Sequence, residues 1–415
     1  MQTTRGETGV THDVIIVGGG IVGATLACAL ADARLRIALL ERYPPPSSPT
    51  GDYDIRVSSI SPGSRLILEA VGAWSGLQQS RICAVEQMHV WDAGGPAAIH
   101  FDSADIGEPC LAYIIENSAM LAALWSCARR VNVELHCPTD VDAVDFCDAN
   151  SAVLLRDGRQ LVARLVVGAD GPQSTVRTDA GIGTTAWDYA QHGIVATVET
   201  ERPHSNIAWQ RFLPSGPLAF LPLADGRSSI VWSVDTPYAE ELLLLDDADF
   251  RQELESAFGA NLGAIRSTGP RSAFPLQRTH AARYVSARAA LVGDAAHTVH
   301  PLAGQGANLG LFDAAVLAEV LLDAHRRNRD IGSLTVLRRY ERWRKGDNLA
   351  MLFLTDALKR LFGNSITLVE RVRNIGLDLT NAAAPIKHML MRRAAGLEGD
   401  LPMLARPKQG LQSEH

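Results

Sequence analysis

Three glycines near the N-terminus have the spacing of a phosphate-binding turn. Gly18, Gly20 and Gly23 form a G-x-G-x-x-G motif at the end of the apolar run DVIIVG. In such a turn the first glycine permits a tight bend, the second lets the backbone approach a pyrophosphate, and the third allows a helix to pack closely on a strand. The phosphate then lies at the positive end of the helix dipole. The motif therefore predicts dinucleotide binding.

An acidic residue strengthens this prediction. Glu41 ends the next apolar run, residues 36–40, where an acid can accept hydrogen bonds from the two hydroxyls of a ribose. A carboxylate at that place repels a ribose phosphate, which argues against NADP at this site. A glycine-rich turn in an ordinary α/β protein is the alternative, and it leaves the acid unexplained.

A second group of residues, far along the chain, separates FAD from NAD. Asp294 follows an apolar run that ends near residue 293, and an acid there can bind the hydroxyls of a ribityl chain, which NAD lacks. Gly304, Gln305 and Gly306 precede a predicted helix, whose free N–H groups can face the flavin pyrimidine and stabilise negative charge on the reduced ring. A helix cap alone would explain GDAAH at 293–297, but the whole segment from Gly293 through GQG at 304–306 and into the predicted helix favours FAD.

These residues need a strand, a turn and a helix to position them. Residues 13–18 are typical of a buried parallel strand, residues 20–33 of a helix, and residues 36–40 of a second strand. The uncharged stretch 14–31 is long enough for a short membrane span, but its clustered glycines favour the turn. The proline-rich segment 42–54 is expected to be a loop.

Three regions are expected, with an α/β fold class (α+β overall). Residues 12–184 and 281–330 would form a Rossmann-like FAD-binding domain. Residues 185–280 are rich in aromatic and β-branched residues between Pro–Gly turns, which predicts an inserted, mostly antiparallel β-sheet substrate domain. Some strands of that domain are expected within residues 80–115, and residues 331–400 form a helical C-terminus.

Composition and missing motifs exclude other classes. The formal net charge of −7 gives no reason to expect nucleic acid as a partner. The six cysteines form no C-x-x-C pair, which suits free thiols in a reducing compartment. Residues 1–12 lack the order of a signal peptide, so a cytoplasmic protein is expected. His297 and His300 lie near Asp294 in sequence, but no further ligand is identifiable, and no metal is expected.

The sequence resembles the flavoprotein aromatic hydroxylases related to para-hydroxybenzoate hydroxylase. It contains three of their motifs: GGGIVG, GADG at 168–171 and GDAAH at 293–297. Within that group, DIRVSSIS at 54–61 and HPLAGQGANLG at 300–310 are similar to the ubiquinone-biosynthesis hydroxylases, and other segments look most like the 2-polyprenylphenol hydroxylase branch. The resemblance extends over roughly residues 12–400.

The resemblance implies site residues. Arg56 would contact the flavin, Asp170 would serve a fingerprint shared by FAD and NAD(P)H sites, and Asp294 would bind the ribityl chain. No catalytic acid or base is identifiable. The complete set of predicted cofactor-binding residues is Gly18, Gly20, Gly23, Glu41, Arg56, Asp170, Asp294, Pro301, Gly304, Gln305, Gly306, Ala307 and Asn308.

The resemblance also implies a reaction. One oxygen atom from O2 would enter the ring of a polyprenylated phenol through a flavin C4a-hydroperoxide, with the cofactor carrying the hard chemistry. NAD(P)H or another donor would visit without a Rossmann domain of its own, because there is no second G-x-G-x-x-G. Four aromatic residues on predicted strands are candidates for a substrate wall. Period-two alternation puts only some of them on the flavin side, and ordinary sheet packing is the alternative: Trp209, Phe212, Phe220 and Trp232.

The C-terminal region has a basic excess. Seven Lys/Arg and three Asp/Glu lie between Asp356 and Gly396. A helix with a solvated basic face explains this, and so does peripheral docking to the inner membrane or to a ubiquinone-biosynthesis protein complex, where a polyprenyl substrate would be found. Two rival functions stay open: a flavin-dependent reductase or dehydrogenase of an isoprenoid compound, and a flavin-bearing subunit without catalysis.

Overall fold

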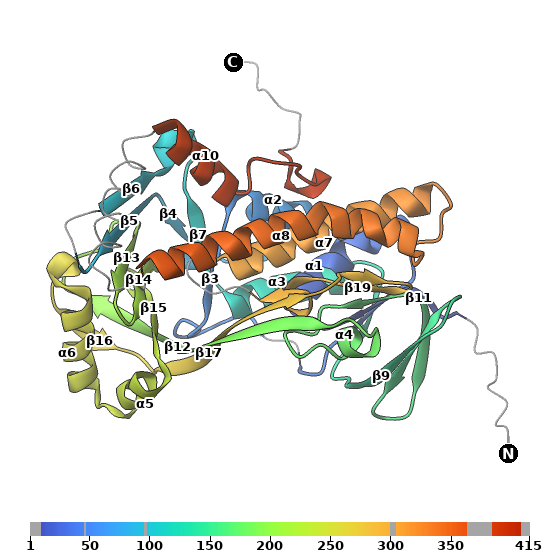
Figure 1. Ribbon diagram of the computed structural model, residues 1–415, viewed down its shortest axis with the longest axis horizontal. Helices are drawn as coiled ribbons and strands as arrows, with labels where there is room; N and C mark the ends of the chain where they lie inside the picture. Colours follow the sequence, from blue (N-terminus) through green and yellow to red (C-terminus); the bar gives the residue numbers. More distant parts are fainter. Residues whose placement is uncertain (1–9, 45–46, 95–97, 299–303, 363–383, 408–415) are drawn as a thin grey trace.

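The computed structural model describes residues 10–44, 47–94, 98–298, 304–362 and 384–407. Two large sheets lie toward opposite ends of an elongated molecule, and long helices run along one side of it (Figure 1). The expected fold class is confirmed, because a Rossmann-like sheet, a mostly antiparallel sheet and C-terminal helices are all present. Of the helices in the described ranges, none is long and apolar enough to cross a membrane.

The eight-stranded sheet carries the glycine motif. Its order is β18-β19-β11-β1-β2-β8, and β10 pairs with β11 and with β9. The central β1 pairs in parallel with both neighbours, so that Val14 aligns with Leu165 on one side and with Ile37 on the other. The strands are β1 (His12–Val17), β2 (Ile37–Leu40), β8 (Val133–His136), β9 (Val141–Phe146), β10 (Ser151–Leu155), β11 (Gln160–Gly168), β18 (Val285–Ser286) and β19 (Ala289–Leu291).

Helices follow from local sequence signals. The expected strand–turn–helix over residues 13–33 is confirmed as β1 and α1 (Ile21–Leu30). Helix α2 (Pro62–Ala70) begins after Ser61, whose hydroxyl oxygen accepts a hydrogen bond from the Ser64 N–H. Helix α1 packs against α3 (Asn117–Arg130) and α7 (Gln305–Arg326). The short helix α4 (Thr175–Asp179) follows β11.

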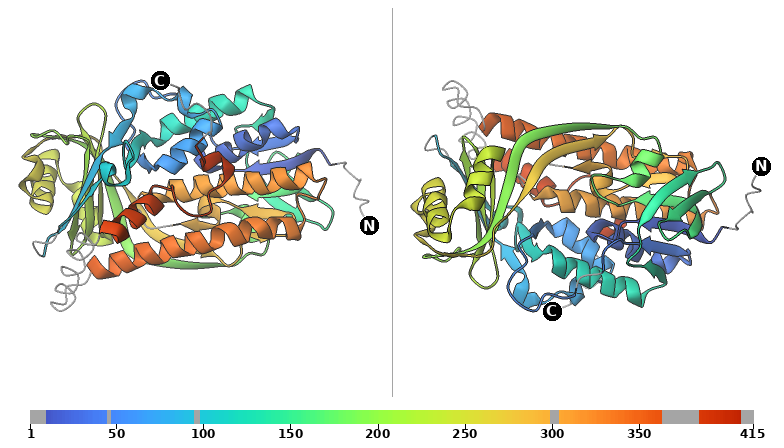
Figure 2. Two further views of the ribbon diagram at one scale, coloured as in Figure 1. Left: turned by 90° about the horizontal axis from the view of Figure 1, so that it is seen from above. Right: turned by 90° about the horizontal axis from the view of Figure 1, so that it is seen from below.

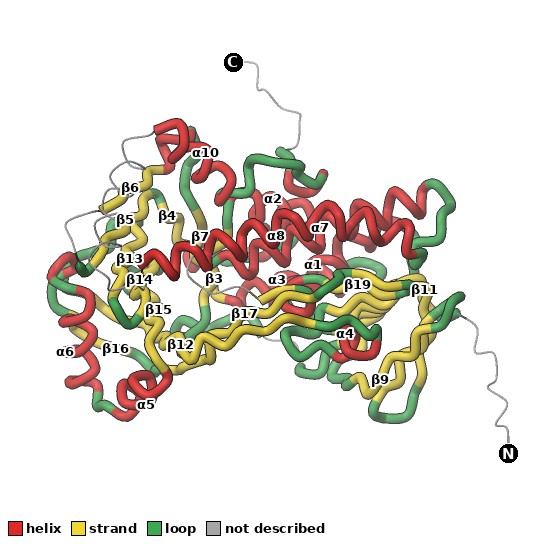
Figure 3. The backbone as a smooth tube through the Cα atoms, in the orientation of Figure 1, coloured by secondary structure: helices red, strands yellow, loops and turns green. Residues whose placement is uncertain are grey.

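The nine-stranded sheet is mostly antiparallel, with one parallel pair between β13 and β5. Its long strands β12 and β17 extend toward the eight-stranded sheet (Figure 3), and α5 and α6 cover its outer face (Figure 1). Its elements are β5 (Gln87–Asp92), β6 (Ala98–Asp102), β12 (Thr184–Thr200), β13 (Ile207–Leu213), β14 (Gly216–Pro222), β15 (Ser228–Asp235), β16 (Ile265–Thr268), β17 (Ser272–Ala281), β20 (His297–Thr298), α5 (Thr236–Leu244) and α6 (Asp247–Phe258).

A small sheet and two further helices complete the described fold. The small sheet has the order β3-β7-β4, with β3 (Val57–Ile60), β4 (Cys83–Val85) and β7 (Ala112–Glu116). Helix α8 (Leu334–Phe362) packs along α7, as Figure 2 shows, and α10 (Ala384–Ala394) lies nearer the nine-stranded sheet.

Candidate flavin site

The turn after β1 has the backbone that a pyrophosphate requires. Gly18 has φ +103°, and an added Cβ would lie 2.2 Å from the carbonyl oxygen of Ala169. A Cβ on Gly23 would lie 1.9 Å from the carbonyl oxygen of Gly18. Gly20 differs, because it has φ −64° and its Cβ would meet nothing within 4 Å in the described part of the chain. The side of Gly20 is therefore open to a ligand, as FAD requires.

Glu41 lies where the sequence predicts it, and the protein itself occupies part of its carboxylate. Oε2 of Glu41 accepts from the N–H of Gly19 at 2.7 Å, and Oε1 accepts from the N–H of Tyr43 at 2.9 Å. The carboxylate thus fixes the glycine turn and keeps lone pairs for a ribose. Sequence reasoning missed Trp125, whose indole N–H donates to the carbonyl oxygen of Gly19 at 2.8 Å from helix α3.

Asp170 follows β11, close to the glycine turn. Its Oδ2 accepts from the N–H of Val176 at 3.2 Å, while its Oδ1 is buried without a hydrogen-bond partner in the described ranges. Burial raises the pKa of Asp170, and the hydrogen bond with Ser174 opposes that rise. Because a buried carboxylate oxygen needs a partner, Asp170 is suited to a polar ligand group.

Arg56 and Asp294 come together from distant parts of the chain. Burial raises the pKa of Asp294, whereas the charges of His297 and Arg56 lower it. The Asp294 side chain is nevertheless exposed. Protein atoms crowd it, but a ligand can still reach it. The guanidinium of Arg56 lies 5.8 Å from the ring centre of Phe274 on β17. A carboxylate, a cation and an aromatic ring therefore meet where the two large sheets approach each other.

The N-terminus of α7 adds backbone donors to this place. The left-handed Gly304 (φ +58°) packs on Ser59 of β3, and Gln305, Gly306 and Ala307 form the first turn of the helix, partly exposed. Asn308 has a different role: its Nδ2 donates to the carbonyl oxygen of Ser59 at 2.9 Å, and its Oδ1 accepts from the N–H of Ser61 at 2.9 Å. Asn308 thus anchors the helix start.

Pro301, which the sequence also assigns to the cofactor, lies outside the described residues. His300 also lies outside the described residues, so its position relative to His297 is not described.

A buried ionic network supports the turn that carries Asp294. The carboxylate of Asp313, fully buried on α7, accepts from Nε of Arg344 at 2.8 Å and from Nδ2 of Asn348 at 3.0 Å. It also lies 2.5 Å from Nε2 of His297 and accepts from the N–H of Gly293 at 3.1 Å. Burial alone would raise the pKa of Asp313, but His297 and Arg344 outweigh it and bring the pKa to about 2. The sequence analysis did not identify Asp313.

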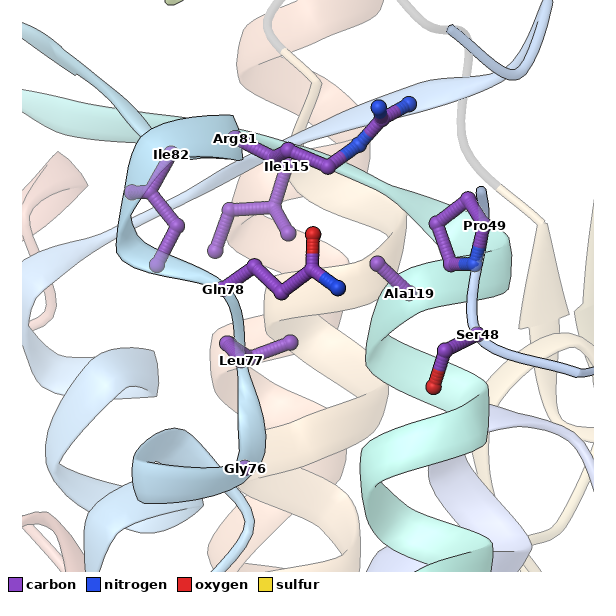
Figure 4. Close-up of a pocket in the computed structure, with 9 residues that line it drawn as sticks. All are labelled: Ser48, Pro49, Gly76, Leu77, Gln78, Arg81, Ile82, Ile115 and Ala119. Atoms are coloured by element: carbon purple, nitrogen blue, oxygen red, sulfur yellow. The ribbon is translucent and has the colours of Figure 1, made fainter. Parts of the chain in front are cut away.

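A separate small pocket lies between α3 and residues 76–82 (Figure 4). Its lining is Ser48, Pro49, Gly76, Leu77, Gln78, Arg81, Ile82, Ile115 and Ala119. None of these residues belongs to the predicted cofactor set. Arg81 is already held by the buried Glu116, with Nε 2.6 Å from Oε2. The pocket therefore carries no part of the flavin assignment.

Three of the four aromatic residues proposed for the substrate wall match the alternative of ordinary sheet packing. Trp209, Phe220 and Trp232 belong to the core that the nine-stranded sheet forms with α5 and α6, where Phe220 stacks on Phe258 with ring centres 3.9 Å apart. These three side chains face away from Arg56 and Asp294. Alternation along β13 puts Phe212 on the opposite face, which is the face of Phe274. The alternation of side chains along a strand separates the two faces of the sheet, but it does not show which face the helices cover.

The basic C-terminal residues also differ from the simplest expectation. Nζ of Lys387 lies 2.9 Å from Asp105, Nε of Arg392 lies 3.1 Å from Glu398, and a guanidinium nitrogen of Arg393 lies 3.6 Å from Asp347. Each cation therefore has an acidic partner inside the chain. Lys387 thus ties α10 to Asp105, whereas the side chains of Arg392 and Arg393 remain 39% and 61% exposed.

The fold and the site together define an FAD-dependent monooxygenase. The glycine turn, Glu41, Asp294 and the start of α7 fit the pyrophosphate, ribose, ribityl and flavin parts of FAD, and the open side of Gly20 leaves room for it. The chain belongs to the FAD binding domain family, whose model matches residues 11–346.

Known proteins support this assignment. The chain is 41% identical to the ubiquinone hydroxylase UbiL of Rhodospirillum rubrum, over 94% of this chain and 91% of that protein. It is 36% identical to the 3-demethoxyubiquinol 3-hydroxylase of Escherichia coli K12, over 93% of this chain and 98% of that protein. The crystal structure of p-nitrophenol 4-monooxygenase PnpA from Pseudomonas putida DLL-E4 superposes with a TM-score of 0.76 at 20% identity, covering 94% and 98% of the two chains, and shows the same fold.

Proposed function

We propose that this enzyme hydroxylates the aromatic ring of a polyprenylated phenol in ubiquinone biosynthesis. The observation that carries the proposal is similarity over nearly the whole of two relatives that are named for ubiquinone hydroxylation. The site is compatible with it, because an aromatic side chain, Phe274, lies beside the flavin-binding candidates Arg56 and Asp294.

The chain's own residues would bind and orient the cofactor. The glycine turn holds the pyrophosphate at the N-terminus of α1, Glu41 holds the ribose and Asp294 holds the ribityl chain. The free N–H groups at the start of α7 face the pyrimidine edge, where they stabilise negative charge on the reduced ring. The chemistry that the bound flavin would supply is activation of O2.

The phenol would lie between the flavin and the inner face of the nine-stranded sheet. That face carries Phe212 and Phe274, whereas α5 and α6 cover the outer face. The ring of Phe274 packs over Gly193, because a Cβ at Gly193 would lie 2.9 Å from it. An apolar wall there would exclude water, which otherwise favours loss of hydrogen peroxide.

The three regions of the chain would have different roles. Residues 12–184 and 281–330 would bind FAD, residues 185–280 would hold the substrate, and residues 331–400 would form the C-terminal region. NAD(P)H or another donor would reduce the flavin. The apolar substrate would be taken from the inner membrane or from a biosynthetic complex by peripheral association.

Quinone analysis of a deletion strain tests the proposal. Loss of the gene should stop ubiquinone synthesis and accumulate a polyprenylated intermediate that lacks one ring hydroxyl. The parent gene should restore synthesis, and a gene encoding Asp294→Ala should not, provided that the variant protein is present at parental levels. An unchanged quinone profile in the deletion strain would refute the assignment.

Two other functions give different results. A flavin-dependent reductase or dehydrogenase of an isoprenoid compound would change the saturation of an intermediate and leave its oxygen count unchanged. A flavin-bearing subunit without catalysis would be restored equally well by the parent and by the Asp294→Ala gene.

A further inference from the structure

Two histidines and one glutamate, none of them among the flavin candidates, meet on one face of the Rossmann-like sheet. His12 begins β1, and Glu134 and His136 lie two residues apart on β8, so alternation puts both of the latter on the same face. Their ligand atoms all lie within 4.8 Å of one another. His12 is 5% exposed, and the side chains of His136 and Glu134 are 11% and 57% exposed.

The hydrogen bonds of Thr11 favour one tautomer of His12. The Thr11 hydroxyl donates its proton to the carbonyl oxygen of Val162 at 2.9 Å and accepts from the N–H of Val162 at 3.2 Å. Its oxygen lies 2.8 Å from Nδ1 of His12. With the hydroxyl proton on the Val162 carbonyl oxygen, Nδ1 donates to the Thr11 oxygen, and a neutral His12 then has its lone pair on Nε2.

That lone pair points at a carboxylate. Nε2 of His12 lies 2.8 Å from Oε2 of Glu134, and Nε2 of His136 lies 2.7 Å from Oε1 of the same residue. Nε2 of His136 is buried, and within the described ranges its contact with Glu134 is close but lacks hydrogen-bond geometry. One carboxylate therefore faces two imidazole nitrogens. A positive charge between them would remove the repulsion between the carboxylate and the lone pairs of neutral rings.

We propose that His12, Glu134 and His136 bind one divalent transition-metal ion of the zinc class. Two imidazole nitrogens and one carboxylate oxygen are a common zinc ligand set, with water as the fourth ligand and metal–nitrogen distances of about 2.0–2.1 Å. Thr11 behind His12 supplies the outer partner that orients a metal-binding histidine. This proposal does not depend on the reaction of the enzyme.

The location gives the ion a structural role. The ligands come from β1 and β8, on either side of β2 in the sheet order. The carbonyl oxygen of His136 accepts from the N–H of Glu41 at 3.0 Å. A metal ion would therefore brace the strand ends beside the ribose acid without touching the flavin.

Zinc binding to the FAD-loaded protein tests the site. After treatment with a chelator, the parent should take up one Zn2+ per chain in equilibrium dialysis, and titration calorimetry gives the affinity. Thr11→Val should weaken binding about 10–100-fold, as expected for loss of a partner behind a ligand. His12→Ala and His136→Ala should weaken it further. His325→Ala, at the end of α7, should bind like the parent.

The flavin spectrum and near-UV circular dichroism report whether each variant is folded. If a histidine variant is unstable, Glu134→Gln tests the same site. The Glu134 side chain is largely exposed, and glutamine has the same shape as glutamate. The proposal is overturned if the parent binds no Zn2+ at micromolar concentration, or if the ligand variants and His325→Ala bind it equally. Either result would leave Glu134 as an ion-pair partner of the two histidines.

Discussion

The carboxylate of Asp313 accepts a hydrogen bond from the backbone N–H of Gly293, 3.1 Å away, and so joins helix α7 to the turn that carries Asp294. Arg344 on α8 and His297 share the same carboxylate. One buried residue therefore ties together a strand end and two helices around the proposed ribityl site.

Replacing Asp313 should destabilise the protein strongly. Asp313→Ala removes the buried carboxylate that pairs with Arg344, whose side chain is 5% exposed, and leaves Asp347 at 3.5 Å as its acidic partner. Breaking a buried pair on one side costs about 3–5 kcal/mol. Asp323→Ala is the matched control, because Asp323 pairs with Arg327 and Arg339 nearer the surface of the same helix, where pairs contribute about 0–1 kcal/mol. Urea unfolding measures both. Equal losses would contradict a special role for Asp313.

Two glycines of one motif should respond differently to the same change. Gly20→Val should fold, because its Cβ points into open space with an ordinary φ, and should lose FAD through steric overlap with the pyrophosphate. Gly23→Val should lose the fold itself, because its Cβ would lie 1.9 Å from the carbonyl oxygen of Gly18. Circular dichroism and flavin absorbance separate the two effects. A folded Gly20→Val protein with a full complement of FAD would be incompatible with the assignment.

Asp294 should matter for FAD and not for the fold. Crowding by protein atoms raises its pKa, so ionising Asp294 costs more free energy in the folded than in the unfolded chain. Asp294→Asn should therefore leave the apo protein at least as stable as the parent. Loss of a charged hydrogen-bond partner costs about 1.5–3 kcal/mol, or roughly ten- to a hundred-fold in FAD affinity. Fluorescence titration of the apo proteins measures this, and unchanged affinity would place the ribityl chain elsewhere.

Acid should weaken the fold through His280. Burial, helped by His297, Lys345 and Arg278, lowers the pKa of His280 from 6.5 to about 4. Between these values the unfolded chain binds a proton that the folded chain does not, so stability falls as the pH falls from about 6.5 to 4. The contribution is at most about 3 kcal/mol. His280→Gln should flatten the dependence of unfolding free energy on pH in this window; a slope identical to that of the parent would refute the link.

The two faces of the nine-stranded sheet should have different functions. Phe212→Ala and Phe274→Ala should uncouple the reaction, giving hydrogen peroxide without hydroxylated product, because both side chains are on the proposed substrate face. Trp232→Ala, in the core with α5 and α6, should lower stability by about 3–5 kcal/mol and leave the ratio of product to consumed O2 unchanged. Uncoupling by Trp232→Ala alone would reverse the assignment of the faces.

The sequence predicted the features that depend on short segments. The glycine turn and its strand and helix are contiguous, so their residue types specify them directly. Trp125 and Asp313 were missed because their roles depend on tertiary contacts: the indole of Trp125 meets Gly19, 106 residues away, and Asp313 meets Arg344 on another helix. The sequence could not assign Trp209, Phe220 and Trp232 to a face of the sheet, because strand alternation does not reveal which face α5 and α6 cover.

The central claim is that one atom of O2 enters the aromatic ring, and 18O2 labelling tests it most directly. The FAD-loaded protein, an electron donor and a polyprenylated phenol react under 18O2, and mass spectrometry follows the product. The account predicts one 18O atom in each newly hydroxylated ring and none when the label is in water. A product formed without 18O would contradict the account and indicate a flavin dehydrogenase instead.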